Sequence, residues 1–260
     1  PPPPPPPPPP FFITQKPASE ILSGLVGSEM CIRDSISSML TLILAEASLE
    51  TVPDQLQNHP SVTAYCKRNR KKPSQILLDN SWHFAAMKGL TNEIKRGRPD
   101  IIHLALLAIC STPLYQEKKI KVFVHTINNQ VITLGDQIRL PKSYHRFQGV
   151  IEKLFKEKKI ELSDSKLIEM ENMTFEELLN KINPEKVIGF STEGKNSTFD
   201  ESSKTITENS CIVIGGFQKG HFDEDTKNKF DQIERLSENS LETHVVLSRL
   251  IYEYEKTIFM

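Results

Sequence analysis

The feature that most constrains the fold is a short apolar run that ends in glycines near the carboxyl end of the chain. Residues 211–214 read Cys-Ile-Val-Ile, which is typical of a strand buried on both faces of a parallel sheet. Gly215, Gly216 and Gly220 follow, and glycine lets the main chain take positive φ and lie bare against a ligand. Because α/β sheets bind ligands at the carboxyl ends of parallel strands, residues 210–222 predict a binding loop. A plain turn is the alternative, and the spacing is not the dinucleotide pattern GxGxxG.

Composition excludes several classes of protein. The 260 residues suit one or two domains, and 32 basic against 33 acidic residues leave a net charge of −1, so an RNA-binding surface must be a local patch. The four cysteines, at 31, 66, 110 and 211, form no CxxC pair, which predicts reduced thiols rather than disulfides or a zinc site. No apolar run approaches the roughly 18 residues of a membrane span. We expect a cytoplasmic protein without metal; His221, Asp223 and Asp225 have no partner cluster that would make them ligands.

The first 38 residues are expected to be a non-native or disordered extension. The ten opening prolines are compatible with a polyproline II arm. Residues 25–34, LVGSEMCIRD, however, correspond to the translation of a transposon-end adaptor used in short-read sequencing. We therefore interpret residues 1 to about 35 as a translated library artefact and expect a natural start at Met39. Residues 39–260 are expected to form a single domain.

The remaining chain predicts alternating strands and helices. Asn128-Asn129 indicates the turn of a β-hairpin, Pro99 with Asp100 a helix start, and Pro141 the start of a helix with an apolar stripe from Phe147 to Phe155. The predicted strands span 39–45, 119–125, 131–134, 186–190 and 211–214. Helices are expected within 48–57, 82–89, 101–110, 141–155, 174–181 and 236–250, and loops at 66–73 and 191–209.

Basic side chains gather at two predicted helix starts. Arg98 and Asp100 lie at the start of a buried helix, and Arg139, Lys142 and Arg146 surround the next start, with Lys142 and Arg146 expected on one helix face. Aromatic residues at 144 and 147 lie among them. Cations hold phosphates and rings stack on exposed bases, so this arrangement suits an RNA site. A solvated helix face is the bland alternative.

Five stretches taken together resemble one family, the ribosomal RNA pseudouridine-N1-specific methyltransferases of the SPOUT, or trefoil-knot, superfamily. The resemblance runs from about Met39 to the carboxyl end and is closest to the archaeal type. The stretches are LLDNSWHFAAM at 77–87, GRPDIIHLALL at 97–107, IRLPKSYHRFQGV at 138–150, IGGFQKGHF at 214–222 and LSENSL at 236–241.

The resemblance implies an α/β fold with a deep C-terminal trefoil knot and a β-hairpin-containing insertion. It implies a homodimer formed through the knotted region and S-adenosylmethionine bound in the knot. Small-subunit ribosomal RNA is the implied partner, held by Arg98, Arg139, Lys142 and Arg146. The implied cofactor residues are Phe190, Ser191, Gly215, Gly220, His221, Phe222, Leu236, Ser237, Glu238, Asn239, Ser240 and Leu241.

The implied reaction moves a methyl group from the cofactor to N1 of a pseudouridine, with Arg98 and Asp100 as catalytic residues. An adjacent arginine lowers the pKa of a carboxylate, so Asp100 is expected to orient Arg98 rather than to act as a base. Lys142 stands where an arginine is usual, and Ser240 where proline is frequent. The alternative functions are an RNA-binding ribosome-assembly factor whose turnover is dispensable and, more remotely, a generic nucleotide-binding protein.

Overall fold

The computed structural model describes residues 39–136, 138–162 and 165–260. The interpretation of residues 1–38 as an extension, including the proline run and Cys31, lies outside the described residues.

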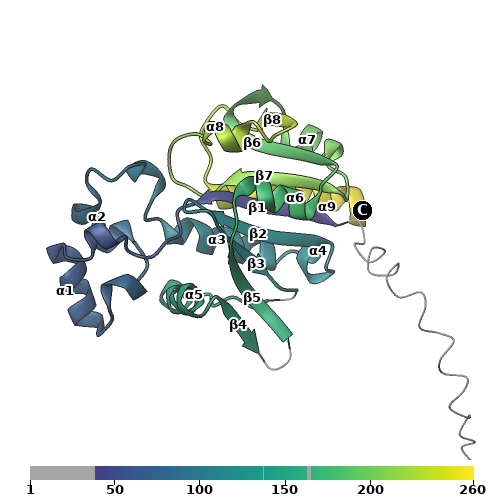
Figure 1. The fold of residues 1–260 in the computed structure, drawn as a ribbon. Helices are drawn as coiled ribbons and strands as arrows, with labels where there is room; N and C mark the ends of the chain where they lie inside the picture. The colour runs from purple at the N-terminus through teal and green to yellow at the C-terminus, as the bar shows by residue number, and fades with distance from the viewer. Residues whose placement is uncertain (1–38, 137, 163–164) are drawn as a thin grey trace, which may run out of the picture. The chain divides into compact units, whose positions relative to one another are not determined.

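Within the described ranges, eight strands form one sheet in the order β4-β5-β3-β2-β1-β7-β6-β8. The five strands from β2 to β8 in this order run parallel, whereas β3, β5 and β4 continue the sheet in antiparallel fashion (Figure 1). The predicted hairpin is therefore part of the main sheet. The strands are β1 (Leu40–Ala47), β2 (Ile120–Thr126), β3 (Gln130–Leu134), β4 (Lys159–Leu162), β5 (Ser165–Asn172), β6 (Lys186–Asn196), β7 (Ser210–Gly215) and β8 (Gln232–Arg235).

Strand β1 lies at the centre of the parallel part and is buried along its whole length. It pairs with β2 on one side and β7 on the other, with Leu44 opposite Ile214 and Ala45 opposite Gly215. The predicted strand at 211–214 and its burial are confirmed. The glycine loop therefore leaves the sheet beside the carboxyl end of β1.

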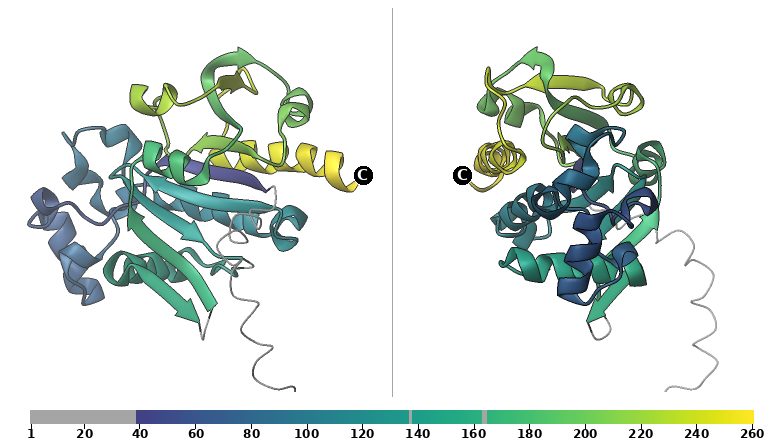
Figure 2. Two further views of the ribbon diagram at one scale, coloured as in Figure 1. Left: turned by 45° about the vertical axis from the view of Figure 1, so that its right-hand side comes forward. Right: turned by 90° about the vertical axis from the view of Figure 1, so that its left-hand side faces the viewer.

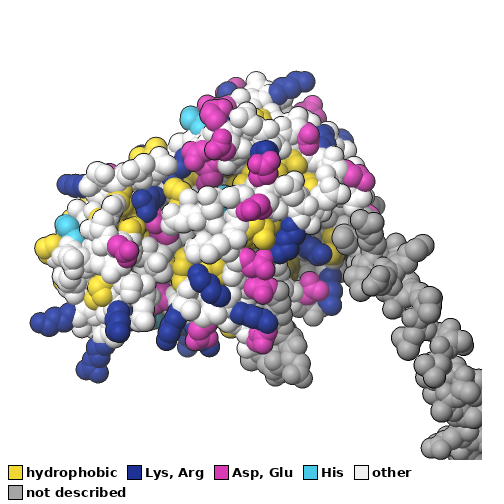
Figure 3. All heavy atoms as spheres, in the orientation of Figure 1, with side chains coloured by type: hydrophobic (Ala, Val, Ile, Leu, Met, Phe, Trp, Pro, Cys, Tyr) yellow, Lys and Arg dark blue, Asp and Glu magenta, His cyan; other side chains and the backbone are white. Residues whose placement is uncertain are grey.

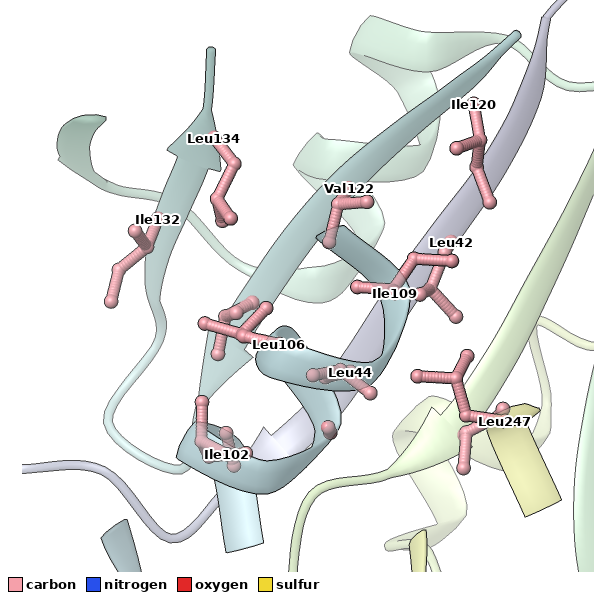
Figure 4. Packing of buried hydrophobic residues seen from close by; sticks show 14 of the residues in the cluster. Leu42, Leu44, Ile102, Leu106, Ile109, Ile120, Val122, Ile132, Leu134 and Leu247 are labelled. Carbon is pink, nitrogen blue, oxygen red and sulfur yellow. The ribbon is translucent and has the colours of Figure 1, made fainter. Parts of the chain in front are cut away.

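Helices cover both faces of the sheet. On one face, α3 and α9 pack on the central strands; Figure 4 shows Leu42 and Leu44 of β1 against Ile102 and Leu106 of α3. On the other face, Leu178 of α6 joins a second apolar cluster. Fully burying an apolar side chain of this size contributes about 1.5–3 kcal/mol. The helices are α1 (Pro60–Asn69), α2 (Asn80–Met87), α3 (Pro99–Cys110), α4 (Pro113–Gln116), α5 (Tyr144–Glu157), α6 (Phe175–Ile182), α7 (Phe199–Thr205), α8 (Glu224–Lys227) and α9 (Thr243–Phe259).

Helices α1 and α2 have a small core of their own, built around Val62, Cys66, Ile76, Ala86 and Met87. They lie together at one end of the sheet, on the left in Figure 1 and in the left view of Figure 2. This pair follows β1 directly in the chain, so residues 48–97 form a subdomain between β1 and α3.

One helix prediction and part of one loop prediction in this part of the chain were wrong. Residues 48–57 contain only a short 3-10 turn at Asp54–Leu56, and α1 extends to Asn69, so residues 66–69 of the predicted basic loop are helical. Helix α1 starts with Pro60 at its first position, and its N-cap is His59, whose Nδ1 accepts from the Ser61 amide at 3.2 Å. Because only Val62 and Cys66 of this helix are buried, its sequence shows no apolar stripe.

Three further boundaries also differ from the prediction. Helix α5 starts at Tyr144 with Ser143 as N-cap, so Lys142 precedes the helix and does not share a helix face with Arg146. Helix α7 lies inside the predicted loop at 191–209 and starts with a capping box of Thr198 and Glu201. Helix α9 starts only at 243, so residues 236–242 remain a loop.

Candidate functional site

A cavity of about 320 Å³ lies between the loop after β7 and the loop after β8. All of the residues expected to bind the cofactor line it except Glu238, which is exposed on the same loop and does not face the cavity. Four further lining residues, Ile214, Phe217, Gln218 and Lys219, belong to the predicted binding loop but were not named as cofactor residues. Five others were not predicted: Thr192, Glu234, Arg235, Thr243 and Val246.

The glycines at the cavity allow a close approach of main chain to main chain. The Gly216 amide donates to Ala45 O and its carbonyl accepts from the Ser48 amide, both at 2.8 Å. A Cβ at Gly216 would lie 2.8 Å from Ala47 Cα, and one at Gly215 would lie 2.9 Å from the Phe217 ring. Any side chain at these two positions would therefore displace the loop.

A buried ion cluster holds the far part of this loop. Lys95 Nζ donates to Glu46 Oε2 at 2.6 Å and to Asp223 Oδ1 at 2.9 Å, and the Asp223 amide donates to Glu46 Oε1 at 2.8 Å. Lys95 also lies 4.8 Å from the centre of the Phe217 ring. Burial alone lowers the pKa of Lys95, but its hydrogen bonds to the two carboxylates outweigh burial and raise that pKa. We call Glu46, Lys95 and Asp223 the Lys95 cluster; no pattern in the sequence indicated it.

The opposite wall of the cavity is tied to the sheet as well. Thr243 Oγ1, in the first turn of α9, donates to the Gly215 carbonyl at 2.8 Å. Arg235 Nε donates to the Ser237 carbonyl at 3.1 Å and orders the start of the loop. Glu234 accepts hydrogen bonds from Ser202 Oγ and Gln232 Nε2, so its buried carboxylate is already bonded.

Arg98 and Asp100 form a two-pronged ion pair at the start of α3. Arg98 Nε donates to Asp100 Oδ1 at 2.8 Å and Nη2 donates to Oδ2 at 2.7 Å. The Asp100 carboxylate raises the pKa of Arg98. Gly97, at φ +66°, precedes them and leaves no space for a side chain, because a Cβ would lie 2.6 Å from Met87 Cε. The arginine is thus held at the junction of α2 and α3.

Helix α3 links this ion pair to the cavity. Ile102 Cδ1 lies 2.8 Å from the position that a Gly216 Cβ would take. The carboxylate of Glu242, which follows the lining residue Leu241, also raises the pKa of Arg98. The first turn of α3 therefore contacts the glycine loop after β7. The residues at its start lie near Glu242, at the end of the loop after β8.

The same helix holds the second basic segment. His103 Nε2 donates to the Pro141 carbonyl at 2.8 Å, and its ring stacks on Phe147 of α5 with centroids 4.4 Å apart. Arg139, Lys142 and Arg146 are exposed, and none of the three forms an ion pair with another described residue. The structure thus places the predicted basic segment against α3. The three cationic side chains of this segment remain exposed to solvent.

The contact between Asp79 and Tyr144 was not predicted, although the sequence analysis had placed Tyr144 among the basic residues of the predicted RNA site. The Tyr144 hydroxyl donates to the Asp79 carboxylate, whose other oxygen caps α2 by accepting from the Ser81 amide at 2.9 Å. Burial and the Asp79 hydrogen bond raise the pKa of Tyr144 far above its usual range. This contact fixes α5 to α2. The signal in the sequence was the aspartate before an Asn-Ser pair, a usual helix cap.

The described residues contain no group of three or more His, Cys, Asp or Glu side chains suited to a metal ion. No helix among them has both the length and the apolar character needed to cross a membrane. Cys66, Cys110 and Cys211 are free thiols.

The fold and the site define an α/β protein with a small-molecule pocket at the ends of its parallel strands, beside an exposed cationic segment. The pocket is lined by two glycines, three phenylalanines and a mixture of polar and aliphatic side chains. Residues 42–255 match the sequence profile of the EMG1/NEP1 methyltransferase family, and the chain belongs to that family. The family resemblance found in the sequence is confirmed. The expected α/β fold class is confirmed as well.

Curated relatives and a solved structure agree with this assignment. The chain is 41% identical over 186 residues to the ribosomal RNA small subunit methyltransferase Nep1 of Thermococcus sibiricus, covering 71% of this chain and 84% of the relative. It is 35% identical over 219 residues to Nep1 of Pyrococcus furiosus, covering 83% and 96%. The crystal structure of Archaeoglobus fulgidus Nep1 bound to S-adenosylhomocysteine superposes with a TM-score of 0.76 at 35% identity, covering 85% of this chain and 99% of that one.

Proposed function

We propose that this protein methylates N1 of a pseudouridine in small-subunit ribosomal RNA with S-adenosylmethionine as donor, and so serves small-subunit biogenesis. The observation that carries the proposal is the pocket with Gly215 and Gly220 in its wall, whose neighbouring Glu242 acts electrostatically on the Arg98–Asp100 pair. Its relatives support the substrate class, because they are named as ribosomal RNA small subunit methyltransferases.

The pocket residues fit S-adenosylmethionine. Gly215 and Gly220 line the pocket without side chains, and Phe190 and Phe222 with Leu241 supply apolar walls for an adenosine ring. The loop is not a phosphate cradle, in keeping with a cofactor that carries no phosphate. A solved relative with S-adenosylhomocysteine bound supports the same choice. When bound, the cofactor supplies an electrophilic methyl group on its sulfonium.

The roles of Arg98 and Asp100 follow from their geometry. Both oxygens of Asp100 accept hydrogen bonds from Arg98, so Asp100 fixes the guanidinium and is a poor base beside that cation. Arg98 is left to position the RNA and to stabilise negative charge on the ring carbonyls of the target base. The N1 proton then leaves to solvent or to a group of the RNA.

The basic segment of residues 139–146 is proposed to hold the RNA backbone. Arg139, Lys142 and Arg146 are exposed and lie on the segment that His103 anchors to α3. Phosphate contacts of this kind position RNA and make its binding depend on salt. Lys142 can hold a phosphate only as a point charge, without the fork of an arginine.

Residues 39–260 are proposed to form a single SPOUT domain with a C-terminal trefoil knot, and two copies to form a homodimer through the knotted region in the cytoplasm. The likeness to the solved Nep1 structure, which covers 85% of this chain, supports the single domain. Light scattering tests the dimer: a mass of about 30 kDa, that of one 29.6 kDa chain, contradicts it.

The test of the function is calorimetry with S-adenosylhomocysteine followed by mass analysis of RNA hairpins. We expect a gain of one methyl group on a hairpin with pseudouridine and none on the same hairpin with uridine, whose N1 is bonded to ribose. A pseudouridine hairpin that stays unmethylated despite cofactor binding refutes the proposal.

Two variants separate binding from turnover. Gly220→Trp should distort the wall of the pocket, because Gly220 lines it, has φ +104°, and would place a Cβ only 3.3 Å from Lys95 Cε. It should abolish cofactor binding and keep RNA binding. Arg98→Lys keeps the charge but loses the fork to Asp100, so it should keep cofactor binding and slow methyl transfer. Intact subunit assembly with Gly220→Trp favours the alternative role as an assembly factor.

A further inference from the structure

A second cleft of about 300 Å³ lies between α1, α2 and α5, outside the pocket described above. It is lined by Tyr65, Arg68, Asn69, Trp82, Tyr144, His145 and Gln148. Trp82 is 49% exposed even though it is the largest side chain of α2. An aromatic side chain of this size left open to solvent in a cleft suggests a ligand with a flat, apolar face.

The lining is unusually rich in planar groups. The Tyr65 and Trp82 rings lie with centroids 5.5 Å apart, and the Arg68 guanidinium is 5.6 Å from the Trp82 ring centre. Tyr144 and His145 close the other side. Aromatic rings and arginine planes are the surfaces on which unpaired nucleobases stack.

The walls of this cleft are held in place. Asn69 Nδ2 donates to the Tyr65 carbonyl at 2.9 Å, and the buried Gln148 donates to the Tyr65 hydroxyl at 3.4 Å. The Tyr144 hydroxyl bonds to Asp79, the cap of α2. The cleft is therefore a built feature of three helices, and Gln148 gives it an amide that can bond to a base edge.

The surroundings of the cleft are cationic. Lys67, Arg68 and Arg70 are exposed at the end of α1 and form no ion pair with any described residue. Figure 3 shows Lys and Arg side chains at the lower left of the molecule, where α1 lies in Figure 1. His145 precedes Arg146, so the cleft is continuous with the basic segment of α5.

We propose that this cleft binds an unpaired nucleobase of the RNA substrate that flanks the methylated position. The proposal rests on the proposed function for the identity of the RNA, but base stacking in the cleft needs no methyl transfer. Positive charge around the cleft favours a nucleic acid over an uncharged ligand. The exposed tryptophan ring favours contact with a base rather than with a phosphate.

Trp82 gives a direct readout because it is the one tryptophan of the whole sequence. In the full chain, a single-stranded oligouridylate should quench tryptophan fluorescence, because the base stacks on the ring. Polyphosphate of matched charge has no bases and should leave the fluorescence unchanged. Equal quenching by both polymers overturns the proposal.

Variants test the contribution of the ring to RNA binding. Trp82→Ala should weaken binding of the pseudouridine hairpin roughly 5- to 150-fold, the range expected for one stacked base, and Trp82→Tyr should restore most of it. Phe84→Ala is the matched control: Phe84 is 60% exposed on the same helix but does not line the cleft, so binding should not change.

The remaining outcomes separate this proposal from the function. S-adenosylhomocysteine affinity should be the same in Trp82→Ala and wild type, which shows that the variant folds. If the protein methylates the hairpin and Trp82→Ala binds that hairpin as tightly as wild type, the cleft proposal is refuted and the proposed function stands. Quenching by oligouridylate without any methylation of the hairpin supports the cleft and refutes the function.

Discussion

Replacing Lys95 by methionine should destabilise the protein more than any change to an exposed charge. Methionine keeps most of the length of the side chain but removes the cation of the Lys95 cluster. Glu46 is only 3% exposed, and its carboxylate would stay buried with the Asp223 amide as its remaining partner.

The magnitude follows from the burial of each carboxylate. Breaking a buried ion pair by removing one partner costs about 3–5 kcal/mol, and Glu46 meets that condition. The Asp223 side chain is 58% exposed, so losing its pair adds at most about 1 kcal/mol. We expect the free energy of unfolding to fall by about 3–5 kcal/mol, nearly all of it from Glu46.

Urea denaturation measures this loss, and calorimetry with S-adenosylhomocysteine measures its consequence for the pocket. Cofactor affinity should fall as well, because the loop carrying Phe217 and Gly220 loses its anchor. Lys121→Met is the control: Lys121 is exposed on β2, and its loss should change stability by no more than about 0.5 kcal/mol. Glu46→Gln in the Lys95→Met background should recover stability, because a neutral amide needs no cation.

The pKa of Lys95 sets the pH range of the effect. Because this pKa is raised above its ordinary value of 10.5, the ion cluster stabilises the fold fully below that pH and loses its effect as pH rises beyond it. Wild type and Lys95→Met should therefore converge at strongly alkaline pH. A Lys95→Met protein within 1 kcal/mol of wild type at neutral pH, or one that Glu46→Gln destabilises further, would refute this account.

Two further predictions concern the sheet and two buried histidines. Gly194→Ala should destabilise the protein by about 1–3 kcal/mol, because its Cβ would lie 2.6 Å from the Glu234 backbone. Gly149→Ala in helix α5 should stabilise it by about 0.5–1 kcal/mol, because nothing lies within 4 Å of its Cβ. Urea midpoints that do not separate in this order contradict the prediction. Burial lowers the pKa of both His83 and His125 below 6.5, so their stabilising effect is full above pH 6.5 and declines as pH falls. The urea midpoint should therefore drop between pH 7.5 and pH 5.0. A variant with both His83→Gln and His125→Gln whose midpoint drops just as steeply would show that the two histidines do not cause the drop.

The sequence predicted those parts of the site whose signals are local. The strand before Gly215 is β-branched and apolar along its whole length, and Pro99 with Asp100 is an unambiguous helix start. These patterns depend on neighbours in the chain and survive in the fold. The predicted cofactor residues also lie together around one cavity, apart from Glu238.

The sequence could not predict contacts made across long separations. Lys95 meets Asp223 at a separation of 128 residues, and nothing near Lys95 distinguishes it from the basic residues around it. Helix α1 was missed because the apolar part of its surface is small. Helix α7 did carry a local sign, since Thr198 and Glu201 have the spacing of a capping box.

The order of the strands in the sheet has a consequence for synthesis on the ribosome. Strand β1 is made before the other described strands, yet one of its two neighbours, β7, emerges 170 residues later by the register of Leu44 with Ile214. Every residue that lines the pocket lies between Phe190 and Val246. The donor molecule therefore cannot bind before these residues have been made, and β1 must keep one edge open until β7 has emerged.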